Sequence, residues 1–139
     1  MDYHRLKASI FLILAVFLTA CATKTVEVAK TPLPKTVLES SLPARKLFEI
    51  SEAYLEYHHG YALRVRDLER GLIVSDWSRE NPLERQQITL RVSPNDRGSI
   101  ISAHIKTEAL TQEGWVDVPT EGEREGLFLS DLQNYLSKK

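Results

Sequence analysis

Histidine and cysteine side chains bind metal ions most readily, so their spacing is the first test for a metal site. His58 and His59 are adjacent, and neighbouring side chains on a helix diverge by about 100 degrees, so both cannot bind one ion. We expect them at a solvated helix end. His104 lies in an alternating stretch that places it on the outward face of a strand. Cys21 is the only cysteine, which excludes sites built from several thiolates. The sequence predicts no metal site and no cofactor.

The carboxylate and hydroxyl side chains form no recognisable catalytic set. Asp67, Glu69 and Asp76 lie in or next to a predicted hairpin, where Asp is favoured as a turn former. Three serines lack the context of a nucleophile elbow, namely Ser75, Ser78 and Ser130. No glycine-rich phosphate loop is present. We therefore predict that the protein is not an enzyme, and peptidoglycan turnover would contradict this prediction.

Trp77 and Trp115 raise the question of a contact surface. We favour the interpretation that both rings fill the core between a sheet and its helices. The alternative is a protein-contact surface, which exposed aromatic side chains often mark. The candidate residues for such a surface are Trp77, Trp115, Arg64 and Arg66. The arginines belong to a predicted basic strip, usually only a solvated face, that also includes Arg79, Arg85 and Arg91, interleaved with Glu80 and Glu84.

Length and composition limit the possible classes of protein. The 139 residues are enough for one domain, and 42% hydrophobic with 27% charged residues is an ordinary globular composition. The 18 Lys and Arg residues are balanced by 19 Asp and Glu residues, so the chain lacks the basic field of a nucleic-acid-binding protein. One cysteine also excludes an internal disulfide framework.

The N-terminus has the pattern of an export signal over residues 1–20. Arg5 and Lys7 precede an uncharged stretch over residues 8–22, which matches a charged n-region followed by an apolar h-region. Its apolar part is about 11 to 13 residues, short of the roughly 20 that a transmembrane helix needs. We expect it to be removed rather than to stay as a membrane span.

The end of this stretch, Leu18-Thr19-Ala20-Cys21, resembles the lipobox of bacterial lipoproteins. The resemblance implies that Cys21 carries a diacylglyceryl group and begins the mature chain, with acyl chains such as palmitate holding the protein on a membrane. Ala22, rather than Asp, implies by the enteric sorting rule an outer-membrane address on the periplasmic face. The alternative is a secreted protein with a chance cysteine after its cleavage site.

After the signal, the pattern predicts a tether and then elements in the order strand, helix, four strands, helix. Residues 21–41 contain two prolines and few large apolar residues, so we expect a flexible tether, with a short first strand possible over 36–40. Apolar residues from Leu47 to Tyr57 recur at helical spacing, so the pattern predicts a helix over 43–59 that Gly60 ends.

Alternating residues predict strands over 61–65, 72–78, 87–92 and 101–106, paired as two hairpins. Residues 115–118 are a brief edge strand or an ordered loop that buries Trp115 or Val116. We expect a loop over 122–126 and a helix from Leu127 onward. The fold class is thus α+β, an antiparallel sheet with an N-terminal and a C-terminal helix packed on one face, in a single domain over residues 42–139.

The block Gly60-Tyr61, Asp67, Gly71, Ile73, Asp76-Trp77 and the strand RQQITLRVSP resembles domains of the BamC (NlpB) family of outer-membrane lipoproteins. That resemblance implies a helix-grip fold and a place in the machinery that assembles outer-membrane β-barrel proteins. Family members of the enteric type carry two such domains behind a long N-terminal partner-binding segment. This chain has the pattern of one domain, so that segment is not carried over.

Together these observations predict a lipid-anchored periplasmic scaffold whose partners are the membrane and other outer-membrane or periplasmic proteins. The alternative is a small-ligand or lipid carrier with a cavity between sheet and helix. Large residues at the inward positions argue against a cavity: Leu63, Val65, Ile88, Leu90, Ile101 and Ile105. The sequence leaves the partner, the binding face, the oligomeric state and the sorting in the source organism open.

Overall fold

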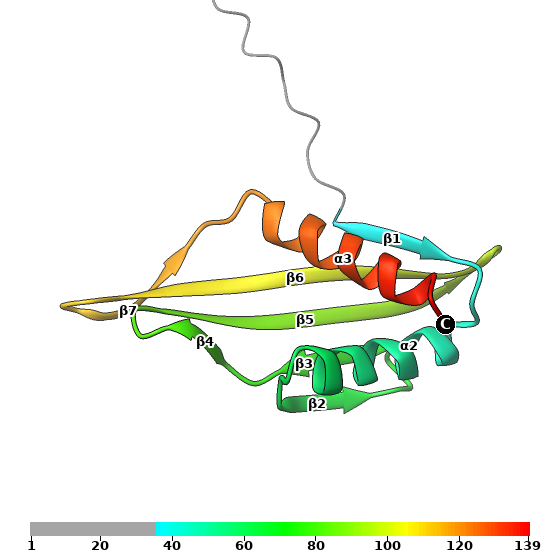
Figure 1. Ribbon diagram of the computed structural model, residues 1–139, viewed down its shortest axis with the longest axis horizontal. Coiled ribbons are helices and arrows are strands. Elements are labelled where there is room, and N and C mark those ends of the chain that lie inside the picture. The colour runs from blue at the N-terminus through cyan, green and yellow to red at the C-terminus, as the bar shows by residue number, and fades with distance from the viewer. Residues whose placement is uncertain (1–35) are drawn as a thin grey trace, which may run out of the picture. The chain divides into compact units, whose positions relative to one another are not determined.

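The computed structural model describes residues 36–139, which form an antiparallel sheet of seven strands with its helices (Figure 1). The predicted signal peptide, Cys21 and the tether up to residue 35 lie outside the described residues. Within the described part, no helix has the length and apolar composition needed to cross a bilayer.

A long hairpin forms the centre of the sheet. Strands β5 (Glu84–Asn95) and β6 (Gly98–Thr111) pair in continuous register from Glu84 opposite Ala109 to Asn95 opposite Gly98. Alternate residues such as Ile88, Leu90 and Ile101 are almost completely buried, because one face of the hairpin packs against helices. The predicted hairpin is confirmed, and both strands are longer than predicted.

Short strands border both edges of this hairpin. On one side β6 pairs with β1 (Val37–Ser40) and β7 (Gly114–Val118). On the other side β5 pairs with β3 (Leu72–Ser75) and β4 (Ser78–Asn81), and β3 pairs with β2 (Leu63–Asp67). All pairs are antiparallel, which confirms the predicted fold class. Two predictions are corrected: the strand over 72–78 breaks at Asp76-Trp77 into β3 and β4, and the sheet begins before residue 42.

The strand β1 belongs to the folded domain for a physical reason. Leu38 packs against the core, and the Ser99 hydroxyl donates to the carbonyl of Leu42 at 2.6 Å, which fixes the chain between β1 and the first helix. The prediction of a strand over 36–40 is therefore confirmed, and the tether predicted to reach residue 41 ends earlier.

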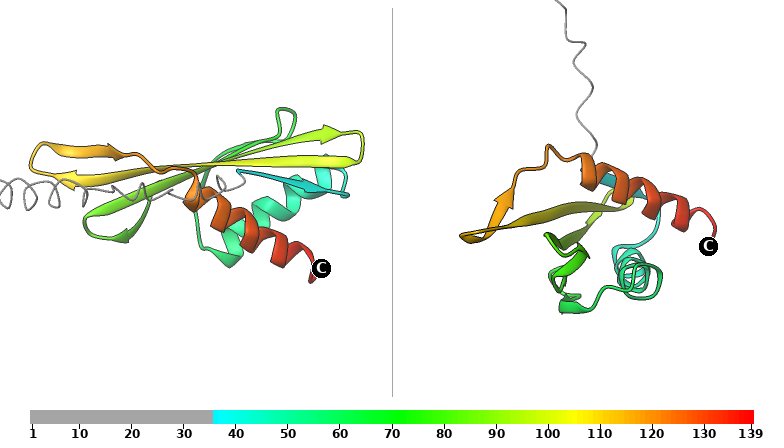
Figure 2. Two further views of the ribbon diagram at one scale, coloured as in Figure 1. Left: turned by 90° about the horizontal axis from the view of Figure 1, so that it is seen from above. Right: turned by 60° about the vertical axis from the view of Figure 1, so that its left-hand side comes forward.

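The first helix is α2 (Ala44–Ala53), and it continues as a π-helical turn, η2 (Tyr54–His58). Its extent confirms the predicted helix over 43–59, and Gly60 follows with a φ of +71°, a conformation that glycine adopts without steric cost. The second helix, α3 (Glu123–Leu136), begins earlier than predicted. Both helices lie on the same face of the sheet (Figure 2).

The core lies between these helices and the sheet. Tyr54 and Leu132, from the two helices, and Ile73, from β3, are each at most 1% exposed. The rings of Tyr54 and Phe128 meet edge to face with centroids 5.7 Å apart, an arrangement that adds to the stabilisation by burial. The interior between the helices and the sheet is filled by side chains.

Two side chains close the gaps that the short strands leave along the central hairpin. Between β1 and β7, the backbone N–H of Ile105 donates to Oε1 of Glu125 at 2.9 Å. Between β3 and β4, the N–H of Ile88 donates to the Ser75 hydroxyl at 2.9 Å. An unpaired buried N–H costs about 1–3 kcal/mol, so both side chains stabilise the sheet at its breaks.

Candidate contact surface on the open face of the sheet

The face of the sheet that carries no helix holds a group of aromatic and charged side chains near β4 and β7. Because Ile88 and Ile105 face the helices, the alternation of β5 and β6 places Arg85, Lys106 and Glu108 on the opposite face. The register of β6 with β7 places Trp115 opposite Leu110, on this same open face. This end of the sheet extends past both helices (Figure 1).

The guanidinium of Arg85 lies between two indole rings. Its Cζ is 4.4 Å from the ring centroid of Trp77 and 4.5 Å from that of Trp115. Two further cations approach the same rings: Arg79 lies 5.4 Å from Trp115, and Lys106 lies 5.7 Å from Trp77. Cation–π contacts of this kind contribute about 0.5–2 kcal/mol each. We call Trp77, Arg85, Lys106, Glu108 and Trp115 the outer-face cluster.

Carboxylates balance the cations of this cluster. Nε of Arg85 donates to Glu108 at 2.7 Å, and Nζ of Lys106 lies 2.9 Å from Glu108 and 3.0 Å from Asp117. The hydrogen bond from Lys106 and that from Arg85 hold the pKa of Glu108 below its usual range, although desolvation opposes this. Hydrogen bonds to Glu108 and Asp117 raise the pKa of Lys106. The cluster is therefore a fixed, charge-paired array rather than a patch of free positive charge.

The interpretation that Trp77 and Trp115 fill the core is wrong. Neither ring belongs to the buried cluster between the helices and the sheet, and both are partly exposed. The reason is that β7 and the β3–β4 connection lie where no helix covers the sheet. The expected burial of Val116 also fails, since this side chain is 47% exposed.

The structure separates the two arginines of the predicted surface from the tryptophans. A register irregularity in β2 between Leu63 and Val65 places Arg66 opposite the buried Ile73, on the helix-bearing face. There Arg66 pairs with Glu56 and lies 3.0 Å from Glu52. Arg64 is exposed on β2, at the edge of the sheet far from β7. Neither arginine belongs to the outer-face cluster.

Sequence reasoning missed Lys106 and Glu108 as members of a site, and it included Arg85 only as part of the basic strip. The signal that identifies them is register: the turn that pairs Asn95 with Gly98 also places Arg85 opposite Glu108. The arrangement of two indoles around a paired guanidinium can bind through stacking and hydrogen bonding.

On the helix-bearing face, a small cleft of about 240 Å³ opens beside the end of η2. Within it Nε2 of Gln86 donates to the Tyr61 hydroxyl and to Glu80, both at 2.6 Å. Burial and the Glu80 carboxylate raise the pKa of Tyr61. Burial lowers the pKa of His59, and so does the neighbouring His58. This cleft is one of several hollows between the sheet and the helices.

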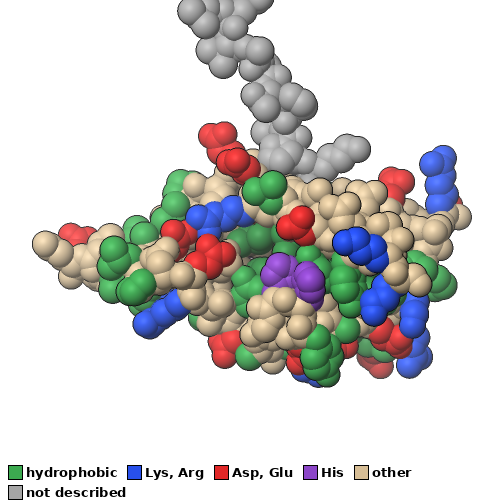
Figure 3. Space-filling model, in the orientation of Figure 1, with side chains coloured by type: hydrophobic (Ala, Val, Ile, Leu, Met, Phe, Trp, Pro, Cys, Tyr) green, Lys and Arg blue, Asp and Glu red, His purple; other side chains and the backbone are tan. Residues whose placement is uncertain are grey.

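The histidines lie as the sequence predicts. His58 and His59 are exposed residues at the end of η2, and imidazole side chains occupy the middle of the helix-bearing face (Figure 3). The ring of His59 nevertheless packs against Tyr54 and Phe128, and this partial burial is what lowers its pKa. The His104 side chain points outward, 75% exposed, with Nδ1 3.7 Å from Glu125. Within residues 36–139, no group of three or more His, Cys, Asp or Glu side chains is placed to hold a metal ion.

Two comparisons with known proteins, by family model and by sequence, find no match. No protein-family model matches the chain, and no curated protein matches its sequence. The membership in a lipoprotein family and the relation to the BamC family therefore stay predictions.

Proposed function

We propose that this chain is a lipid-anchored, non-catalytic contact domain at the periplasmic face of the outer membrane. It acts as an accessory or scaffold protein in outer-membrane protein assembly, in the manner of the BamC family. The observation that carries the proposal is the outer-face cluster. Tryptophan and arginine are the residue types most enriched where binding energy concentrates in protein interfaces.

The shape and charge of the cluster fit a protein contact. The indoles of Trp77 and Trp115 are held in place by Arg85, so little side-chain entropy is lost when a partner covers them. Glu108 already pairs with Arg85, so a partner need not bring its own carboxylate into the interface. A flat, apolar and hydrogen-bonding surface on the partner would match this one.

The lipid anchor supplies the other half of the mechanism. A diacylated Cys21 would keep the domain at the membrane, and a contact that is weak in solution would become effective through high local concentration. Recognition of the partner by the open face and retention at the membrane by the lipid depend on different residues, so each can be removed by its own substitution.

The observation offered for the second candidate function, a small-ligand or lipid carrier, is the cleft of about 240 Å³ beside η2. Side chains fill the space behind it, because Tyr54 and Leu90 are each at most 1% exposed. Native mass spectrometry of the protein after incubation with lipid extract tests this alternative. A retained ligand, lost on Tyr61→Trp substitution, would favour the carrier over the scaffold.

The scaffold proposal is tested by a pull-down of the full-length protein from its own membranes in mild detergent, with Cys21→Ser as the matched control. We expect proteins of the barrel-assembly machinery to be recovered together with the lipidated protein and to be lost when the Cys21→Ser variant is used. Absence of these proteins, with the protein lipidated and abundant, would contradict the proposal.

A further inference from the structure

The strand β1 leaves one of its edges unpaired. The N–H of Ala103 donates to the carbonyl of Thr36 at 3.2 Å, so Thr36 and Ala103 face each other as a hydrogen-bonded pair. Hydrogen-bonded and non-hydrogen-bonded pairs alternate along antiparallel strands. The N–H and C=O groups of Leu38 and Ser40 therefore point toward β6. Those of Val37 and Glu39 point away from it, toward the open edge of the sheet.

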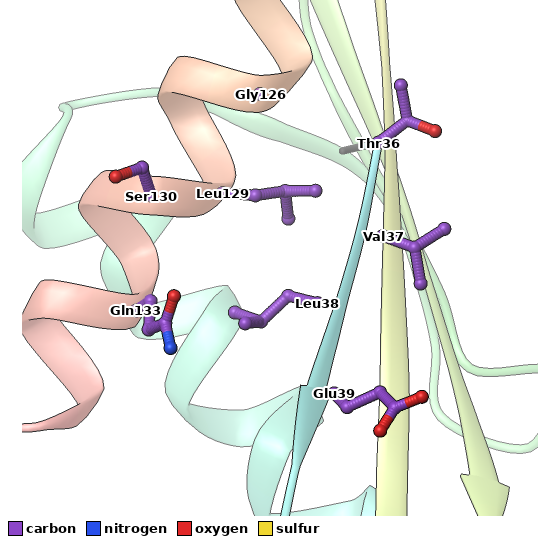
Figure 4. A pocket seen from close by; sticks show the side chains of 8 residues that line it. All are labelled: Thr36, Val37, Leu38, Glu39, Gly126, Leu129, Ser130 and Gln133. Atoms are coloured by element: carbon purple, nitrogen blue, oxygen red, sulfur yellow. The ribbon is translucent and has the colours of Figure 1, made fainter. Parts of the chain in front are cut away.

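A groove of about 700 Å³ runs beside this edge (Figure 4). Its walls are the four residues from Thr36 to Glu39 and a face of α3 made by Gly126, Leu129, Ser130 and Gln133. Those helix residues span about 10 Å at 1.5 Å per residue. This is the length of three to four residues of extended chain. The groove thus has the dimensions of one added strand.

The edge strands on the other side of the sheet, β2 and β4, are protected against such addition. The strand β2 has a register irregularity and the charged residues Arg64, Arg66 and Asp67. The strand β4 also has an irregularity and carries Arg79 and Glu80. Bulges and charges of this kind prevent edge pairing in natural sheets. By contrast, β1 and β7 each keep an unbroken register and have one charged residue, Glu39 and Asp117. Of these two strands, β1 is the one that lines the groove.

One charged side chain, that of Glu39, lies beside the groove, on the side of β1 that is turned away from α3 (Figure 4). Glu39 is exposed and forms no ion pair with any residue in the range 36–139. Leu129 is 3% exposed, and with Leu38 it forms the apolar side of the groove toward the core. Side chains alternate between the two faces along an added strand, so apolar residues would face Leu38 and basic residues would lie near Glu39.

We propose that the groove between β1 and α3 is a docking site for an extended segment of a partner protein, one that alternates apolar and basic residues. The segment adds to the sheet as a further edge strand, with main-chain hydrogen bonds to Val37 and Glu39. This inference does not depend on the outer-face cluster, which lies at the opposite end of the sheet.

The probe is a fluorescein-labelled peptide, Lys-Val-Lys-Val-Lys-Val, and its binding to the full-length lipidated protein in mild detergent is followed by fluorescence anisotropy. The key variant is Val37→Pro. It removes an N–H that points away from β6, so it breaks no hydrogen bond of the sheet. We expect binding to weaken about fivefold or more, the effect of losing one hydrogen bond. Val37→Thr keeps both the N–H and a β-branched side chain, and it should bind as the parent protein does.

Two further measurements separate strand addition from adhesion of a basic peptide. Glu39→Gln should remove the preference for this peptide over Glu-Val-Glu-Val-Glu-Val. Hydrogen exchange followed by mass spectrometry should show that the peptide slows exchange in the segment that contains Val37 and Glu39. A peptide with N-methylated amides cannot donate main-chain hydrogen bonds. It should therefore neither bind nor slow hydrogen exchange in this segment.

Equal binding to the parent protein and to a folded Val37→Pro variant would overturn the proposal, and so would absence of binding to the parent. A third outcome would also overturn it. If binding appears only after residues 22–31 are deleted, the chain's own segment, and not a partner, occupies the groove. Circular dichroism of each variant establishes that it is folded.

Discussion

The carboxylate of Glu108 accepts a hydrogen bond from Nε of Arg85, 2.7 Å away, across the two central strands of the sheet. This pairing holds the guanidinium in place between the rings of Trp77 and Trp115. Lys106 also pairs with Glu108, so this carboxylate is shared by two cations of the cluster.

Replacing Arg85 by Ala should loosen both tryptophans. The substitution removes two cation–π contacts, so we expect the free energy of unfolding to fall by about 1–3 kcal/mol. Indole fluorescence should move to longer wavelength as the rings become hydrated. Arg91→Ala, on the same face and strand but outside the cluster, is the control. Equal stability and equal emission of the two variants would contradict the arrangement.

Stability should depend on acid through Glu108. Because the pKa of this carboxyl is lower in the folded protein than its ordinary value of 4.5, the ionised form is favoured on folding. Its contribution is present above pH 4.5 and is lost as the pH falls through the lower pKa of the folded state. Glu108→Gln should therefore flatten the stability profile at acidic pH, below the ordinary pKa of 4.5, as measured by urea denaturation. The idea fails if both profiles are parallel.

Replacing Glu125 should lower the stability of the fold far more than replacing Glu123, two residues earlier in α3. Glu125 is 4% exposed and accepts the N–H of Ile105, so Glu125→Ala leaves a buried donor unpaired, at a cost of about 1–3 kcal/mol. Glu123 is exposed in the same turn of α3, and Glu123→Ala should change stability by at most about 0.5 kcal/mol. Thermal unfolding of both variants tests the difference, and similar melting temperatures would refute it.

Gly71 and Gly60 offer a second matched comparison. Both have positive φ, +62° and +71°, so alanine is strained at either position. At Gly71 a Cβ would also lie 1.9 Å from the carbonyl oxygen of Val92, whereas at Gly60 nothing lies within 4 Å. Gly60→Ala should cost about 1–2 kcal/mol. Gly71→Ala should cost clearly more, and a smaller loss for Gly71→Ala in chemical denaturation would be evidence against this close approach.

Much of the fold is predictable from the sequence, because the spacing of apolar residues indicates which face of a strand or helix is buried. The period of two around Leu90 and Ile101 predicts the central hairpin, and the helical spacing from Leu47 to Tyr57 predicts α2 with η2. The strand β4 has no such signal, since Ser78–Asn81 has no alternating apolar residues. It forms because β5 supplies a partner and because the Asn81 side chain accepts the N–H of Leu83 at 2.9 Å in the turn.

The candidate site was predictable only in its residue types. Trp77 and Trp115 are conspicuous in the sequence, but which face they occupy depends on where the helices end, and that is a tertiary property. Arg66 has the strand alternation of an outward residue, yet the irregularity in β2 turns it toward Glu52. The first turn of α3 was missed because its polar residues resemble a loop, whereas Glu125 in fact faces the sheet.

The central claim is that the outer-face cluster recognises a protein partner. The most direct test compares an aromatic residue of the cluster with an aromatic residue outside it. Trp115→Ala removes one ring of the cluster, whereas Tyr57→Ala removes an 86% exposed ring on η2, outside the cluster. Both full-length variants are used in the same detergent pull-down from native membranes, and the amounts of partner proteins are measured by quantitative mass spectrometry. We expect the amount of recovered partner protein to fall about tenfold or more for Trp115→Ala, the loss typical of a central interface residue. The amount should stay unchanged for Tyr57→Ala. Retention of the same partners by folded Trp115→Ala would contradict the central claim.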